Sequence, residues 1–277
     1  MGVMVPVGDV ALHVEERGQG PAVLLLHGFT GSVETWRPFL PRWQGFRTVA
    51  VDLLGHGRSD APADPARYAF PRCVADLLAL LEALGIGQVA VVGYSLGGRL
   101  ALHLALALGE RLWALVLESA TPGLLDPRQR AVRVRRDDSL AERLLREGLE
   151  AFVRWWEAQP LFASQARLPP SVRERLRRQR LSHSAVGLAG ALRGLSLGRQ
   201  QPLWRRLSEL IAPALVIVGA LDERYCEVGR RLAAALPRGE LAVVPGAGHA
   251  VHLERPRPFA TLVGRFLDRH RPQEVRA

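Results

Sequence analysis

The chain has 277 residues, of which 48% are hydrophobic, and this is enough for the core of one large domain. Its formal net charge is +10 and it contains no lysine, but the arginines are spread along the sequence without a base-reading motif, so we expect no nucleic-acid partner. Two cysteines cannot build a disulfide framework, and the sequence has no metal-ligand spacing, no leader pattern and no apolar run of about 20 residues, so we expect a cytoplasmic protein without a metal or a membrane span.

Apolar runs with the length of strands alternate with helical patterns along most of the chain. The expected strands cover residues 10–16, 22–26, 47–51, 88–92, 113–117, 214–218 and 241–244. The expected helices cover residues 73–84, 96–108, 228–236 and 256–268. Such an alternation is typical of an α/β fold with a doubly wound, mostly parallel sheet, and we expect this architecture here.

Residues 121–206 interrupt the alternation with a helical pattern, and within it residues 128–206 hold eighteen arginines against seven acidic residues. Because the segment lies between two expected strands, we expect it to leave the sheet and return as a helical cap over the carboxyl ends of the strands. A separate helical domain with its own core is the alternative. The predicted division is a core of residues 1–120 and 207–277 and a cap of residues 121–206. A basic cap beside a site favours a small anionic substrate.

The pattern G-x-S-x-G occurs at residues 93–97, between an apolar strand pattern and a helix rich in Ala and Leu. In this context it predicts a nucleophile elbow, a strained turn that exposes a serine beside a helix N-terminus. Gly93 and Gly97 let the strand and the helix approach each other closely. Ser95 is therefore the candidate nucleophile, and a serine in an ordinary Gly-rich turn is the alternative.

A serine hydroxyl needs a histidine to take its proton and a carboxylate to orient that histidine. On this type of fold the acid follows the serine in the sequence and the histidine follows the acid. Asp222, in the turn after a late strand, is the favoured acid, and Glu118 is the alternative. His249, in a Gly-rich loop after the last strand, is the favoured base, with His252 as the alternative. His183 has no chemical context in the sequence.

An oxyanion hole needs backbone N–H donors near the serine. The N–H of Leu96, the residue after the serine, is one candidate. The other is expected from the loop at residues 27–31, where Phe29 N–H is the best candidate and His27 and Gly28 shape the turn. Arg99 lies one helical turn beyond the serine and can point into the same pocket.

Three segments together carry a resemblance to one family. They are Gly93–Arg99 (GYSLGGR), Glu118–Leu124 (ESATPGL) and Trp156–Phe162 (WEAQPLF). With these motifs the sequence resembles the 2-succinyl-6-hydroxy-2,4-cyclohexadiene-1-carboxylate synthases of menaquinone biosynthesis, which have the α/β-hydrolase fold. The similarity covers almost the whole chain, and the cap motif is more specific than the elbow.

The resemblance implies a lyase that needs no cofactor and eliminates pyruvate from 2-succinyl-5-enolpyruvyl-6-hydroxy-3-cyclohexene-1-carboxylate. It implies a catalytic triad of Ser95, Asp222 and His249, with Phe29 and Leu96 as oxyanion donors. The resemblance also implies a set of substrate-binding side chains. These are Tyr94, Arg99, Arg133, Trp156 and Arg180.

Two other interpretations remain open at this point. A serine esterase or carbon–carbon bond hydrolase acting on a small carboxylated substrate would use Ser95 as a nucleophile. Neutral-ester hydrolases have less need of an arginine beside the serine, so Arg99 separates the two chemistries. A non-catalytic ligand-binding protein of the same fold is disfavoured by the complete Ser-Asp-His set. The sequence leaves open whether the protein is a monomer or a homo-oligomer.

Overall fold

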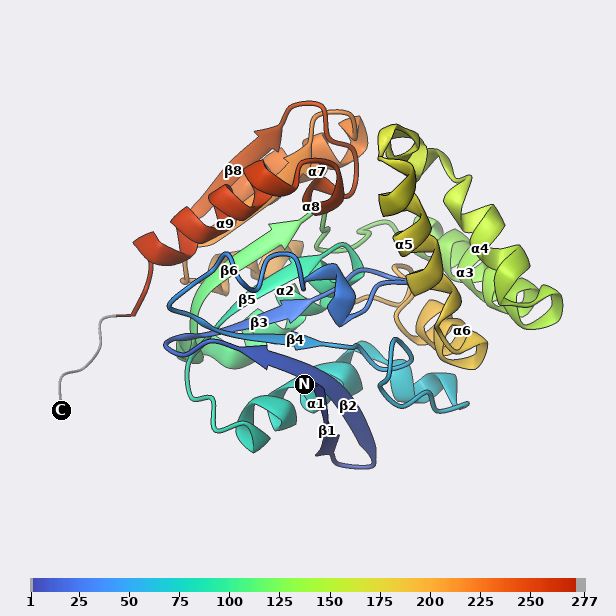
Figure 1. Ribbon diagram of the computed structural model, residues 1–277, viewed down its shortest axis with the longest axis horizontal. Coiled ribbons are helices and arrows are strands. Elements are labelled where there is room, and N and C mark those ends of the chain that lie inside the picture. The colour runs from blue at the N-terminus through green and yellow to red at the C-terminus, as the bar shows by residue number, and fades with distance from the viewer. Residues whose placement is uncertain (1, 273–277) are drawn as a thin grey trace.

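An eight-stranded sheet runs through the centre of the structure, a computed structural model that describes residues 2–272 (Figure 1). The strand order is β1-β2-β4-β3-β5-β6-β7-β8, in which the pairs β1–β2 and β2–β4 are antiparallel and the other pairs are parallel. This confirms the expected mostly parallel, doubly wound sheet. The strands are β1 (Gly2–Val7), β2 (Val10–Arg17), β3 (Ala22–Leu26), β4 (Arg47–Val51), β5 (Val89–Tyr94), β6 (Leu112–Glu118), β7 (Ala214–Gly219) and β8 (Gly239–Val244).

The central strands are buried on both faces, which is why they are almost wholly apolar in sequence. Successive side chains point to opposite faces. In β3, therefore, Leu24 and Leu26 enter one core, and Val23 and Leu25 enter the other. Helices cover both faces: α1 (Phe70–Ala83), α2 (Leu96–Leu108) and α7 (Glu223–Ala235) pack on the first core, and α9 (Pro256–Arg269) packs on the second.

Between β6 and β7 the chain forms a group of helices beside the carboxyl ends of the parallel strands (Figure 1). The longer ones are α3 (Pro127–Glu147), α4 (Leu149–Glu157), α5 (Pro170–Leu181) and α6 (Ala185–Gly194). They share a small apolar cluster that includes Leu144, Phe152 and Leu188, and Phe29 from the sheet side packs against it. The helices thus have a core of their own and also cover the end of the sheet.

The structure extends several expected elements and adds two. Helix α7 begins at Glu223 rather than 228 because Asp222 caps it, with Oδ1 accepting a hydrogen bond from Tyr225 N. The added edge strand β1 is largely exposed and contains Pro6, a residue that a strand tolerates at the edge of a sheet. The other added element is the short helix α8 (Val251–Glu254). No helix within the described residues is long and apolar enough to cross a membrane.

Candidate active site

The turn between β5 and α2 has the geometry of a nucleophile elbow. Ser95 has a φ of 49° and a ψ of −105°, a conformation that residues with a side chain rarely adopt. A Cβ atom on Gly93 would overlap Gly97 O, and one on Gly97 would overlap Leu26 O. Only glycine at both positions therefore lets the strand and the helix come this close, and the turn presents the serine hydroxyl at the carboxyl edge of the sheet.

Ser95, His249 and Asp222 form a continuous hydrogen-bonded chain. His249 Nδ1 lies 2.8 Å from Asp222 Oδ2, and His249 Nε2 lies 3.1 Å from Ser95 Oγ. Because a carboxylate only accepts hydrogen bonds, Nδ1 carries the proton and Nε2 is left to accept the serine hydroxyl. The imidazole is 2% exposed, so its orientation is fixed by these partners and by packing. The arrangement can move a proton from Ser95 to the imidazole.

Two loops at the ends of β7 and β8 bring the acid and the histidine together. Gly219 makes this possible, because a Cβ atom there would overlap Gly248 O. Leu221 N donates to Ala247 O at 2.8 Å, which joins the loops directly. Glu254 of α8 fixes the second loop by accepting a hydrogen bond from Gly248 N at 2.7 Å.

The alternative acid and the alternative base pair with each other instead. Glu118 accepts hydrogen bonds from His252 N and His252 Nδ1, each at 2.9 Å, and both side chains are buried. The partners of His249 are Asp222 and Ser95, so Glu118 does not orient His249, and His252 is hydrogen-bonded to Glu118 rather than to Ser95. The pair connects the end of β6 to α8, which carries the loop of His249.

The two residues predicted to supply oxyanion donors, Phe29 and Leu96, line the same cavity as Ser95. Leu96 N–H is the first donor of α2 and has no partner inside the helix. The carbonyl of Gly28 accepts hydrogen bonds from His27 Nδ1 at 2.7 Å and from Gly31 N at 2.9 Å. In a trans peptide the N–H points away from the carbonyl, so this double contact turns Phe29 N–H away from its own loop. Within residues 2–272 no protein acceptor binds Phe29 N–H.

A cavity of about 440 Å³ lies between the triad and the cap. Ser95 and His249 form part of its floor, and Trp156 of α4 lies on the cap side. The Trp156 ring packs against Phe29 and Phe162, with centroid distances of 5.2 and 5.3 Å. The cavity therefore combines an aromatic wall with the reactive serine, which suits a ring-shaped substrate.

Arg99 brings a positive charge into this cavity without a matching negative charge. It lies one turn after Ser95 on α2, and its Nη1 donates to Leu195 O at 3.0 Å. No carboxylate within residues 2–272 lies within 4.0 Å of its guanidinium. Burial, together with the nearby charge of Arg133, lowers the pKa of Arg99 to about 10. Arg99 is partly buried, and a cation in such a place without an acidic partner within 4.0 Å is costly, so this site favours an anionic ligand.

The other two predicted arginines line the same cavity but have acidic partners. Arg133 donates to Asp137, with an Nε–Oδ2 distance of 2.8 Å. Arg180 is 6% exposed and contacts Glu157 at 3.2 Å, and its burial lowers its pKa. All three arginines therefore line the cavity of the triad, and of these three only Arg99 has no carboxylate within 4.0 Å among residues 2–272.

Two tyrosines flank the imidazole of His249. The ring centroid of Tyr94 lies 5.6 Å from that of His249, and the ring of Tyr225 lies 4.6 Å away. Burial raises the pKa of both phenols, so both are neutral hydrogen-bond donors at neutral pH. The sequence predicts Tyr94 but not Tyr225, whose position three residues after Asp222 is the one signal that could have found it. Further lining residues that the sequence analysis missed are Arg136, Gln159, Gln165, Gln179 and Arg224.

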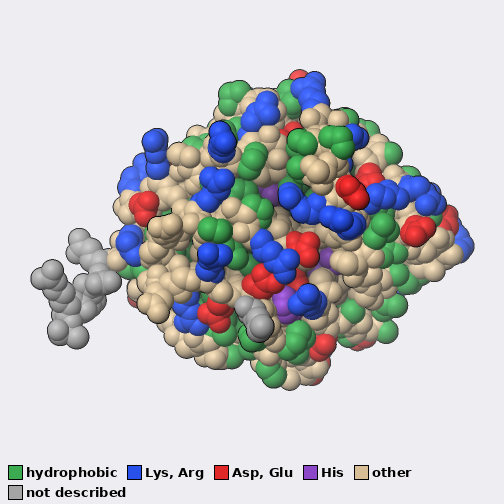
Figure 2. All heavy atoms as spheres, viewed as in Figure 1, with side chains coloured by type: hydrophobic (Ala, Val, Ile, Leu, Met, Phe, Trp, Pro, Cys, Tyr) green, Lys and Arg blue, Asp and Glu red, His purple; other side chains and the backbone are tan. Residues whose placement is uncertain are grey.

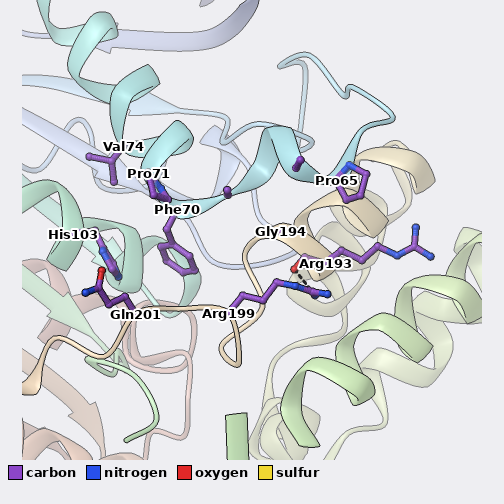
Figure 3. Close-up of a pocket in the computed structure, with 11 residues that line it drawn as sticks. Pro65, Phe70, Pro71, Val74, His103, Arg193, Gly194, Arg199 and Gln201 are labelled. Atoms are coloured by element: carbon purple, nitrogen blue, oxygen red, sulfur yellow. Dashed lines mark hydrogen bonds between the residues drawn. The ribbon is translucent and has the colours of Figure 1, made fainter. Parts of the chain in front are cut away.

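A second cavity, of about 480 Å³, is lined by residues of α1, α2 and the end of α6, among them Phe70, His103 and Arg193 (Figure 3). Phe70 and His103 stand side by side in it, with ring centroids 4.8 Å apart, and Arg199 donates to the carbonyl of Arg193 at its rim. The guanidinium of Arg99 lies 5.5 Å from the centre of the Phe70 ring, so these two side chains separate the cavities. None of the triad residues lines this second cavity.

The surface arginines differ from Arg99 in their surroundings. On the face shown in Figure 2 they are scattered among apolar and acidic side chains. Several form exposed ion pairs, such as Arg37 with Glu15 at 2.6 Å and Arg206 with Glu209 at 2.7 Å. Such pairs contribute only about 0–1 kcal/mol each. Within residues 2–272 no group of three or more His, Cys, Asp or Glu side chains could hold a metal ion.

Comparison with known proteins shows the family to which the chain belongs. The family model of the alpha/beta hydrolase fold matches residues 21–256. A protein of Serratia proteamaculans (strain 568) named 2-succinyl-6-hydroxy-2,4-cyclohexadiene-1-carboxylate synthase is 35% identical over 261 residues, which cover 93% of this chain and 98% of that protein. A Bacillus subtilis (strain 168) protein, provisionally given the same name, is 43% identical over 266 residues, covering 96% and 95% of the two chains.

A solved structure gives the same result at the level of the fold. The structure of MenH from S. aureus superposes with a TM-score of 0.89 at 30% identity, covering 94% of this chain and 99% of that one. The resemblance drawn from the motifs is thereby confirmed. The chain is an enzyme that belongs to the α/β-hydrolase fold and, within it, to the family of 2-succinyl-6-hydroxy-2,4-cyclohexadiene-1-carboxylate synthases.

Proposed function

We propose that the protein is a lyase of menaquinone biosynthesis. It converts 2-succinyl-5-enolpyruvyl-6-hydroxy-3-cyclohexene-1-carboxylate to 2-succinyl-6-hydroxy-2,4-cyclohexadiene-1-carboxylate and pyruvate. The ring loses a proton from the carbon next to the succinyl carbonyl and also loses the C–O bond to the enolpyruvyl group. The departing enolpyruvate takes up one proton and becomes pyruvate, so the overall reaction is balanced without a cofactor.

Ser95 is the proposed proton acceptor, and His249 and Asp222 make it basic enough. As Ser95 Oγ takes the C–H proton, its own hydroxyl proton moves to His249 Nε2, which lies 3.1 Å away. The imidazolium formed in this way is stabilised by Asp222 on its other nitrogen. No bond between Ser95 and the substrate is required.

Loss of the proton places negative charge on the succinyl carbonyl oxygen. The N–H groups of Phe29 and Leu96 are proposed to stabilise this enolate, as they would stabilise a tetrahedral intermediate in a hydrolase. The carboxylates of the substrate are proposed to bind Arg99, Arg133 and Arg180, because guanidinium groups bind carboxylates through two parallel hydrogen bonds. The rings of Tyr94 and Trp156 would then pack on the substrate ring.

The observation that best supports this function is the unbalanced charge of Arg99 beside Ser95. A neutral ester would leave that charge unmatched, whereas a carboxylated substrate supplies the missing anion. The runner-up is an esterase or carbon–carbon bond hydrolase for carboxylated substrates, because the same triad and oxyanion donors serve both chemistries. The two functions differ in whether Ser95 becomes covalently modified.

Incubation of the purified protein with the enolpyruvyl substrate tests the proposal. We expect pyruvate and the cyclohexadiene product to appear in equal amounts. Pyruvate is measured by the oxidation of NADH in a coupled assay, and the diene is measured by its absorbance. The Ser95→Ala variant is the control for uncatalysed elimination. Absence of pyruvate above this control would refute the proposed reaction.

Other parts of the proposal rest on less specific features. We propose a cytoplasmic location, which the two buried, unpaired cysteines Cys73 and Cys226 support. The proposed partner is a small anionic substrate rather than a nucleic acid. We also retain the division into a core, residues 1–120 and 207–277, and a cap, residues 121–206, because the helices of the second segment share an apolar cluster.

A further inference from the structure

The turn between α5 and α6 makes a close contact with the loop that carries Phe29. His183 lies in this turn and is 6% exposed. Its Nε2 is 2.9 Å from Thr30 O, and its Nδ1 is 2.9 Å from Gly57 N. One imidazole therefore joins the cap to the loops that follow β3 and β4.

The hydrogen-bond partners determine the tautomer of His183. Gly57 N–H only donates, so Nδ1 must accept, and the carbonyl of Thr30 only accepts, so Nε2 must carry the proton. Burial lowers the pKa of His183, which favours this neutral form. The imidazole is thus held as a donor to Thr30 and cannot serve as a general base in the cavity.

Thr30 belongs to the turn that orients Phe29 N–H, and we call residues 28–31 the oxyanion turn. Gly31 N donates to Gly28 O at 2.9 Å and closes this turn, and Thr30 adopts a φ of 62°, which is unfavourable for a residue with a side chain. Such a conformation needs support from its surroundings. The hydrogen bond from His183 to the Thr30 carbonyl supplies that support from the cap.

The same end of α5 also reaches the substrate cavity. Gln179 Nε2 donates to Ser32 Oγ at 2.8 Å, directly after the oxyanion turn. Arg180, the next residue, faces the cavity and contacts Glu157 and Gln165. A segment of five residues therefore holds both a proposed carboxylate-binding arginine and the two contacts to the loop of the oxyanion donor.

We propose that His183 is a positioning residue, which holds the oxyanion turn in its active geometry and couples it to the docked cap. The inference rests on the proposed function, because it takes Phe29 N–H as a donor to the developing enolate. His56 completes the support, since its ring lies 5.1 Å from that of His27, 5.6 Å from that of Phe29 and 5.5 Å from that of His183. Loss of the His183 contact frees the turn while Arg180 keeps its own partners.

Hydrogen exchange measured by mass spectrometry tests the structural half of the proposal in the full-length protein. His183→Leu replaces the imidazole by an apolar side chain of similar size, which removes both hydrogen bonds. We expect peptides that cover residues 27–35 to exchange at least tenfold faster than in the wild type. Trp204→Phe is the matched control, because it removes one side-chain hydrogen bond of the cap, from Trp204 Nε1 to Gly123 O at 2.8 Å, in which none of residues 27–35 takes part. If His183→Leu does not fold because leucine does not fit the site, His183→Ala, which also removes both hydrogen bonds but has a smaller side chain, replaces it.

Steady-state kinetics test the functional half. His183→Leu should lower kcat for pyruvate release by about ten- to hundredfold, since losing one oxyanion donor costs about 10²–10³ in kcat. KM should change by less than about threefold, because Arg180 retains Glu157 and Gln165. His183→Gln should recover part of kcat, because its amide can donate to Thr30 O. Trp204→Phe should leave both constants unchanged.

The outcomes separate this proposal from the proposed reaction. Unchanged exchange at residues 27–35 in His183→Leu would overturn the positioning role whatever the enzyme catalyses. Faster exchange with an unchanged kcat would overturn it as well, because the turn would then not matter for turnover. A wild-type protein that releases no pyruvate would instead refute the reaction, and the exchange measurement would still decide the role of His183.

Discussion

Glu118 and His252 form a second buried acid–histidine pair, joined by two hydrogen bonds of 2.9 Å, and the Tyr94 ring packs against both His252 and His249. One of these bonds comes from the backbone N–H of His252, so the carboxylate fixes both the ring and the start of α8. The pair resembles half of a triad in composition, but no serine hydroxyl is hydrogen-bonded to His252 in the part of the chain that the structure describes. We interpret it as the support for the loop that carries His249.

The two acids should therefore respond differently to removal of their charge. Asp222→Asn should lower kcat by about 10³–10⁴, because the amide no longer fixes the imidazole tautomer. Glu118→Gln should lower the free energy of unfolding by about 1–3 kcal/mol and leave the kcat of the folded enzyme within a few-fold. Pyruvate release and urea unfolding, measured on both variants, check this. An inactive Glu118→Gln beside an active Asp222→Asn would transfer the role of the acid to Glu118.

Ser95 should remain free of covalent intermediates during turnover. Because we assign it to proton transfer, no acyl group should accumulate on it, and serine-directed phosphonates should react slowly. Intact-protein mass spectrometry of enzyme quenched at saturating substrate measures this. Enzyme that has been modified with such an inhibitor is the positive control, because its spectrum shows that an adduct on Ser95 can be detected. A stoichiometric adduct of the native substrate on Ser95 would support the hydrolase interpretation instead.

Much of the core of the site can be predicted from the sequence because its parts are local or follow strand ends. The elbow is encoded within five residues, and the strained turn at Ser95 needs glycines at 93 and 97. Asp222 and His249 each follow an apolar strand pattern. Parallel strands end at one edge of the sheet, so residues separated by 154 positions in the sequence meet there.

The contacts made by the cap could not be predicted in this way. His183 lies 153 positions from Thr30, and their contact depends on how the cap helices pack on the sheet. A histidine without neighbouring motif residues looks the same in sequence whether it is exposed or clamped between two loops. The unbalanced charge of Arg99 is likewise invisible, because it depends on which acids the fold brings near and which it keeps away.

The buried histidines should make the protein sensitive to acid. Burial lowers the pKa of His27 and that of His103 to about 4 each, and for His27 this outweighs the opposite effect of the nearby Asp52. Burial also lowers the pKa values of His56 and His183. The unfolded chain, with histidine pKa values of about 6.5, then binds more protons than the folded one. Stability is therefore fully present above about pH 6.5 and is lost as the pH falls towards 4.

Urea unfolding between pH 7.5 and 4.5 measures this loss. His27 and His103 should each add a slope that approaches about 1.4 kcal/mol per pH unit between the unfolded pKa of about 6.5 and pH 4.5, and almost none above it. His103 makes no side-chain hydrogen bond within the described residues, so the variant His103→Gln should fold. Its free energy of unfolding should depend less steeply on pH than that of the wild type, by the slope that corresponds to about one proton. Equal slopes in the wild type and His103→Gln would contradict the assignment of a lowered pKa to His103.

Arg99 should be the arginine whose loss most reduces activity. It shares the rigid helix of Ser95, and no carboxylate within residues 2–272 balances its charge. A bidentate contact between charged groups contributes roughly 1.5–3 kcal/mol, so Arg99→Ala should lower kcat/KM for the carboxylated substrate by about ten- to several-hundredfold. Arg99→Lys should recover only part of the loss, because an ammonium group lacks the planar pair of donors.

The matched control for Arg99 is Arg193→Ala, which removes a positive charge from the second cavity instead. It should change kcat/KM by less than about twofold, since any effect on the substrate would be long-range and screened by salt. Rising salt should raise KM for the carboxylated substrate in the wild type and less so in Arg99→Ala. A neutral ester, if the enzyme hydrolyses one, should lose little in Arg99→Ala. Equal losses on charged and neutral substrates would mean that Arg99 supports the elbow through Leu195 rather than binding an anion.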